Sequence, residues 1–179
     1  MLKPQDVLTA LKLYCLGQSE WSFRDLGSML GLSIGETHGS IKRLKESVLV
    51  YEREKIIKVS NKRLCDFLIH GVSSVFYAKR GQVSRGMLTG PSASPLVERM
   101  APGEGDIPIV WPTVDGRARG ESLEPLYPTV PMAAAADAVL YEMLVLVDAI
   151  RVGRARERKI AAELLTKRLV PGMDENKEA

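Results

Sequence analysis

The chain has 179 residues, of which 45% are hydrophobic and 26% are charged, a balance typical of a soluble globular protein with a core. Its formal net charge is +3, and residues 42–63 alone carry eight basic and three acidic side chains. No window contains the roughly 18 apolar residues of a membrane span, and the first residues lack the basic and apolar regions of a signal peptide.

The first predicted helix runs from about Pro4 to Leu16. Proline is favoured at the first helical position because its missing N–H has no partner there anyway. Apolar side chains recur at helical spacing on one face, which we expect to be buried. These side chains belong to Val7, Leu8, Leu11, Tyr14 and Cys15. Gly17 is a plausible end of this helix.

Two capping boxes predict the next two helices. Ser22 with Asp25 begins the second helix, and Ser33 with Glu36 begins the third. Gly31 lies between them, where a turn with a positive φ is needed. We expect one face of each helix to be buried. The residues on these faces are Leu26, Met29 and Leu30 in the second helix, and Ile34, Thr37, Ile41 and Leu44 in the third.

A short hairpin and a fourth helix complete the first predicted domain, residues 1–72. The β-prone runs 48–50 and 56–59 flank the polar residues 52–55, a pattern typical of a two-stranded hairpin with a charged tip. Ser60 or Asn61 then begins a helix that ends near Gly71.

Residues 73–132 are predicted to form a Pro-rich extended arm. Eight of the ten prolines lie in 81–132, together with many apolar side chains, and a residue that precedes proline favours extended backbone. Such a stretch is too long for an ordinary loop. Its apolar side chains need a surface, which is either this chain's own core, a second copy of the chain or another protein. Residues 107–111 suit an added edge strand.

The C-terminal region, 133–170, is predicted to be helical and to end in a flexible tail, 171–179. Its first helix is apolar around most of its circumference and must be buried on several sides. A dimer interface is a natural solution, and Gly153 is expected to break or kink the helix. The residues assigned to this interface are Leu140, Met143, Leu144, Val147 and Ile150.

The run from Phe23 to Ser33, followed by Ile41 to Leu44, resembles the winged helix-turn-helix regulators of the MarR-like group. The small Gly27, the turn Gly31 and Leu44 match that pattern. The resemblance implies a mainly α fold with a small β-hairpin wing, in which helix 33–46 enters the major groove of DNA and the wing near 51–56 touches the backbone or the minor groove. The implied DNA-binding residues are Ser33, Gly35, His38, Lys42 and Arg43 on the helix, and Arg53 and Lys55 on the wing.

These features predict a cytoplasmic, dimeric repressor that binds double-stranded DNA. Gly35 and Gly39 offer no side chain to a base, so phosphate contacts and DNA shape would dominate recognition. The alternative is an antitoxin or accessory subunit whose winged helix and residues 81–132 bind a partner protein.

An enzyme, a cofactor and a metal site are not expected. The sequence has no glycine-rich phosphate loop and no plausible set of nucleophile, base and orienting group. Cys15 and Cys65 are too few for a disulfide framework, and His38 and His70 do not cluster with them.

Overall fold

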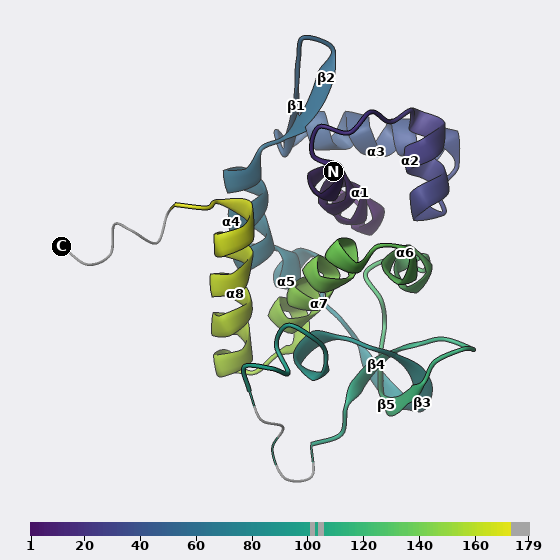
Figure 1. Ribbon diagram of the computed structural model, residues 1–179, viewed down its shortest axis with the longest axis vertical. Helices are drawn as coiled ribbons and strands as arrows, with labels where there is room; N and C mark the ends of the chain where they lie inside the picture. The colour runs from purple at the N-terminus through teal and green to yellow at the C-terminus, as the bar shows by residue number, and fades with distance from the viewer. Residues whose placement is uncertain (101–102, 104–105, 173–179) are drawn as a thin grey trace, which may run out of the picture.

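The computed structural model describes residues 1–100, 103 and 106–172, so the predicted tail lies outside the described residues from 173 onward. The fold is mixed α/β, with helices around two small sheets (Figure 1). The N-terminal half is mainly helical. Its elements are α1 (Pro4–Leu16), α2 (Phe23–Leu30), α3 (Ile34–Glu46), β1 (Val50–Arg53), β2 (Ile56–Val59), α4 (Asn61–His70) and α5 (Val72–Val75).

The second half contains a sheet followed by helices. Its elements are β3 (Arg80–Leu88), the 3-10 turn η1 (Gly90–Ser92), β4 (Ile109–Pro112), β5 (Ala118–Leu123), α6 (Val130–Ala136), α7 (Ala138–Val152) and α8 (Ala155–Leu169). In Figure 1, helices α1–α3 and the β1–β2 hairpin occupy the upper part of the molecule and strands β3–β5 the lower part, with α7 between them. Helices α4 and α8 pack side by side.

Both predicted capping boxes are present. The Ser22 hydroxyl accepts a hydrogen bond from the Asp25 N–H at 3.1 Å, and the Ser33 hydroxyl accepts one from the Glu36 N–H at 3.2 Å. Hydrogen bonds from the serines lower the pKa of Asp25 and of Glu36, so both carboxylates are ionised at neutral pH. Their negative charges lie at the N-termini of the two helices, where they interact favourably with the helix dipoles. Gly31 adopts the left-handed conformation, with φ 64°.

Two residues predicted to be buried are exposed. Met29 and Ile34 retain 38% and 46% of their accessible surface. A helix advances about 100° per residue, which puts Ile34 roughly 70° from the middle of the buried arc of α3 and Met29 roughly 100° from that of α2. Both side chains therefore lie at the margin of, or beyond, the faces that pack inward.

Residues 73–132 do not form an extended arm. Strands β3, β4 and β5 pair with one another, β3 running antiparallel to both partners and β4 running parallel to β5. Gly86 permits this closure, since a Cβ at that position would lie 2.0 Å from the Trp111 carbonyl oxygen. The surface that covers the apolar side chains is the chain's own core, where Val110 and Trp111 are fully buried.

The predicted dimer residues lie inside the single chain. All five are buried, and α7 packs against α1, α6, α8 and η1 of the same chain. The expectation that α7 is enclosed on several sides is therefore confirmed, but its assignment to an interface between two copies is wrong. The five residues are Leu140, Met143, Leu144, Val147 and Ile150. Gly153 separates α7 from α8, as predicted.

A buried polar network fastens the sheet to α7. The Asp148 carboxylate accepts hydrogen bonds from the Trp111 indole N–H at 2.6 Å, from the Thr89 hydroxyl at 2.9 Å and from the Arg151 guanidinium at 2.6 Å. Arg151 also donates to the Phe76 carbonyl oxygen at 2.8 Å. Both charged side chains are almost completely buried, so each depends on its partners for the polar contacts that water would otherwise provide.

We predict that Asp148→Asn lowers the free energy of unfolding by about 3–5 kcal/mol, because it leaves the Arg151 charge buried without its counter-ion. Asp66→Asn is the matched control: Asp66 is exposed on α4, and its replacement should change stability by less than about 0.5 kcal/mol. Urea denaturation followed by circular dichroism measures both. Equal, small effects would contradict the assigned role of the network.

Candidate nucleic-acid interface

Helix α3 presents a largely exposed face built from the residues that the sequence assigned to DNA. Ser33 caps the helix and is exposed, and Gly35 follows in the first turn with open space where a side chain would project. His38 and Lys42 are exposed on the next two turns. The structure thus brings four of the seven predicted residues to one helix, on its solvent side.

His38 is held by an aromatic partner from α2. Its ring stacks on that of Phe23 with the ring centroids 3.7 Å apart and the planes 11° from parallel. The stacked pair lines a groove that also includes Ile41, Lys42, Lys45 and Glu46, with a volume of about 330 Å³. The stack restricts the orientation of the imidazole while leaving its edge accessible to a ligand.

Arg43, also assigned to DNA, is held in an ion pair within the chain. Its guanidinium donates two hydrogen bonds to the Asp6 carboxylate of α1, from Nε at 2.8 Å and from Nη2 at 2.7 Å, and Asp6 is fully buried. Hydrogen bonding to Asp6 raises the pKa of Arg43. Asp6 also accepts a hydrogen bond from the Lys3 N–H, so its charge stabilises the start of α1 as well. Arg43 therefore joins α3 to α1.

The Arg43–Asp6 ion pair explains why residue 39 is a glycine. A Cβ at Gly39 would lie 3.1 Å from an Arg43 guanidinium nitrogen, tighter than an ordinary contact. The glycine leaves room for the guanidinium to lie along the helix surface. Two features of the sequence signalled this arrangement: Asp6 occurs on the apolar face of α1, and Gly39 stands one turn before Arg43.

The β1–β2 hairpin carries the other two predicted residues. Arg53 is exposed and lies 3.6 Å from the Glu54 carboxylate, and Lys55 is exposed at the tip. Glu54 and Lys55 have φ values of 54° and 64°, as a two-residue turn of type I′ requires. Lys45 of α3 forms an ion pair with Glu52 of β1, which links the hairpin to the helix.

Five exposed cations without an ion pair among the described residues lie on α3, on the hairpin and in the first turn of α4. They are Lys42, Lys55, Lys58, Lys62 and Arg63. Other exposed cations without an ion pair among these residues lie elsewhere, including Arg85 on β3, Arg119 on β5 and Arg156 on α8. Sequence reasoning counted Lys58, Lys62 and Arg63 in the local positive charge but did not assign them to the site. The alternation along β2, in which Ile56 and Lys58 share the exposed side, was the available signal.

The C-terminal half supports this surface from behind. The Thr129 hydroxyl donates to the Leu30 carbonyl oxygen at 2.6 Å, at the end of α2. A Cβ at Gly31 would collide with side-chain atoms of Thr129 and Met132, so α6 and the residue before it cover the turn between α2 and α3. The orientation of α3 is therefore fixed by contacts from both halves of the chain.

The described ranges contain no group of three or more His, Cys, Asp or Glu side chains placed to hold a metal ion. Burial raises the pKa of Cys15 to about 12 and also raises the pKa of Cys65, so both thiols stay protonated at neutral pH. No helix within these ranges is long and apolar enough to cross a bilayer.

Compared with known proteins, the chain matches no protein-family model, no curated protein and no solved structure. The resemblance to winged helix-turn-helix regulators therefore rests on the residues quoted for it.

Two neighbouring residues on α3 separate structural from binding roles. We predict that Arg43→Gln lowers the free energy of unfolding by about 3 kcal/mol, because it leaves the Asp6 carboxylate buried without its counter-ion. Lys42→Gln should change stability by less than about 0.5 kcal/mol, because Lys42 is exposed and unpaired among the described side chains. Thermal and urea denaturation measure both. An Arg43→Gln protein as stable as the unmodified one would contradict the structural role assigned to the Arg43–Asp6 ion pair.

Proposed function

We propose that α2, α3 and the β1–β2 hairpin form a winged helix-turn-helix, and that the protein is a regulator that binds double-stranded DNA. The observation that carries this proposal is the group of five exposed, unpaired cations on α3, the hairpin and α4 among the described residues. Lysine and arginine side chains arranged in this way neutralise phosphates and release counter-ions from a duplex.

The surface favours phosphate contacts over base reading. Lys42 and His38 are the only long side chains among the predicted residues that remain accessible on α3, since Arg43 is bound to Asp6. Bidentate contacts from Arg, Asn or Gln carry most direct base readout, and α3 offers none of these on its exposed face. Sequence preference would then come from DNA shape and from the hairpin.

The single chain is the DNA-binding unit in this proposal. The α7 side chains that the sequence assigned to a dimer are buried in the chain's own core. A dimeric repressor would therefore need a different contact surface, and the proposal does not require one.

A second candidate function rests on apolar side chains around the hairpin. Val48, Tyr51 and Ile56 are each about half exposed. Apolar patches of this kind occur at protein–protein interfaces. An accessory subunit that binds a partner protein through this surface is the alternative to a DNA-binding regulator.

Salt-dependent binding to a labelled random-sequence DNA duplex tests the first function. The logarithm of the binding constant, measured by fluorescence anisotropy between about 50 and 200 mM KCl, should fall linearly with the logarithm of salt. The triple variant Lys42→Gln, Lys55→Gln, Lys58→Gln should reduce the slope by about 0.9 per lost cation, or about 2.7 in total.

The control variant removes three exposed cations elsewhere, on α8: Arg156→Gln, Arg158→Gln, Lys159→Gln. It changes net charge equally, so its slope should stay within about 0.5 of the original. Equal losses in the two variants would show attraction by net charge alone. No salt-sensitive binding by the unmodified protein would reject the DNA-binding function and leave the protein-binding alternative.

A further inference from the structure

A cavity of about 250 Å³ lies at the other end of the molecule, between β3, the segment that follows it, and the start of α8. This volume is far above the roughly 10–15 Å³ that a single water molecule needs, so the cavity has room for a small organic ligand. Its lining combines apolar side chains with both signs of charge, which is the composition expected of a ligand site rather than of a packing defect.

The apolar part of the lining is incompletely covered. Leu88, Val97, Ile107 and Ile109 all contribute to the wall. Val97 retains 37% and Ile107 59% of its accessible surface, whereas Ile109 is buried. Binding of an apolar ligand removes such exposed apolar side chains from water, which lowers the free energy of the complex.

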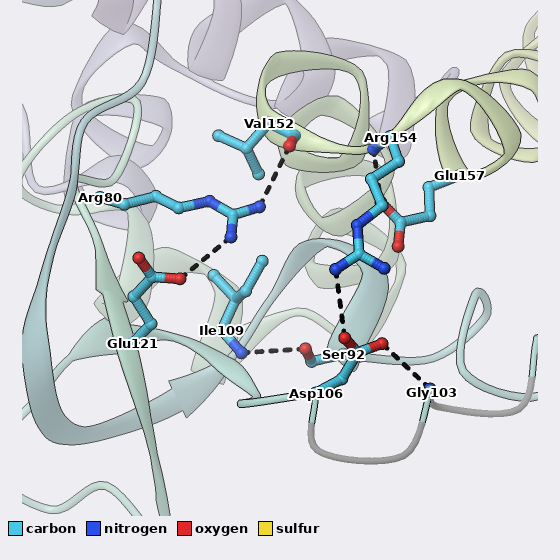
Figure 2. A network of polar contacts seen from close by, with 9 residues as sticks. All are labelled: Arg80, Ser92, Gly103, Asp106, Ile109, Glu121, Val152, Arg154 and Glu157. Atoms are coloured by element: carbon cyan, nitrogen blue, oxygen red, sulfur yellow. Dashed lines mark hydrogen bonds and ion pairs between the residues drawn. The ribbon is translucent and has the colours of Figure 1, made fainter.

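Two arginines supply unused hydrogen-bond donors to the cavity. Arg80 of β3 donates to the Val152 carbonyl oxygen at 3.1 Å and to the Glu121 carboxylate at 3.0 Å. Arg154 donates from one guanidinium nitrogen to the Asp106 carboxylate at 3.1 Å. Figure 2 shows these side chains coming from different elements, with Ile109 and Ser92 between them in that view. A guanidinium has five N–H groups, so each arginine has donors left for a ligand.

Two acids balance the charge of the arginines. Asp106 accepts hydrogen bonds from Arg154 and from the Gly103 N–H at 3.0 Å, and these contacts lower the pKa of Asp106. Glu157 accepts a hydrogen bond from the Arg154 N–H at 2.5 Å through one carboxylate oxygen. The cavity lining therefore holds two positive and two negative side chains, a net charge of zero.

We propose that this cavity binds a small zwitterion with an apolar side chain, such as an aliphatic α-amino acid. The ligand carboxylate would contact Arg80 and Arg154, its ammonium group Glu157 and Asp106, and its side chain the wall formed by Leu88, Val97 and Ile107. A simple anion or cation would face an equal number of like charges, and an uncharged apolar molecule would cover guanidinium donors without pairing them. The site does not depend on the proposed DNA-binding function.

Isothermal titration calorimetry of the full chain tests this proposal with three probes of similar size. L-leucine carries both charges, 4-methylpentanoate lacks the ammonium group and 3-methylbutylamine lacks the carboxylate. Leucine should bind, and each analogue should bind at least about tenfold more weakly, because a charge-assisted contact is lost. No heat with leucine at about 10 mM, or equal affinity for either analogue, would overturn the proposal.

Neighbouring arginines on the same helix provide the matched variants. Arg154→Gln should weaken leucine binding about tenfold or more, because it removes a guanidinium that lines the cavity. Arg156→Gln removes an exposed positive charge that does not line the cavity and should leave the affinity unchanged. Equal effects of the two variants would reject the assigned site. DNA binding is not measured here, so this outcome is independent of the DNA-binding proposal.

Discussion

The Asp148–Arg151 pair on α7 is the contact on which the rest of this structure depends. The two side chains lie one helical turn apart, and both are almost completely buried. An isolated buried charge is very costly, so each needs all of its partners. Those partners are the Phe76 carbonyl oxygen at the end of α5, the Thr89 hydroxyl, the Trp111 indole N–H in β4 and the Glu124 carbonyl oxygen. Segments spread over residues 76–124 therefore converge on a single turn of helix.

This convergence explains why the proline-rich segment belongs to the body of the protein. If residues 81–123 detached as an arm, Asp148 would lose the Trp111 and Thr89 donors while remaining in an apolar environment. The docked sheet then determines where the chain leaves β5. From there Thr129 and α6 reach the turn between α2 and α3. The buried pair thus helps to orient the proposed DNA-binding helix through a continuous series of packed elements.

The features that sequence predicted correctly are those that neighbouring residues determine. The two capping boxes, the turn at Gly31, the β1–β2 hairpin and the break at Gly153 all have local causes. Periodicity also predicted that α7 is enclosed on several sides. Periodicity indicates that a face is buried but does not identify what covers it, which is why a dimer was inferred where the chain's own helices and sheet do the covering.

The errors concern contacts between distant residues. Arg43 pairs with Asp6, which precedes it by 37 positions, and Gly39 was interpreted as a missing base contact although it leaves room for the Arg43 guanidinium. Strand β3 pairs with β4 and β5 across more than twenty residues, where prolines obscured the strand pattern. The cavity between β3 and α8 is likewise formed by residues up to 77 positions apart. Sequence reasoning could not show that Arg80 and Arg154 line one cavity.

The central claim is that the sheet and the helices form one cooperative unit joined at Asp148. Hydrogen exchange of the Trp111 indole N–H, followed by NMR in D2O, tests it most directly because this proton is the one donated to Asp148. The account predicts that the indole proton exchanges as slowly as the α7 backbone amides, by global unfolding alone. Rapid exchange of the indole proton while the α7 amides remain protected would show that the sheet detaches on its own, and would contradict this account.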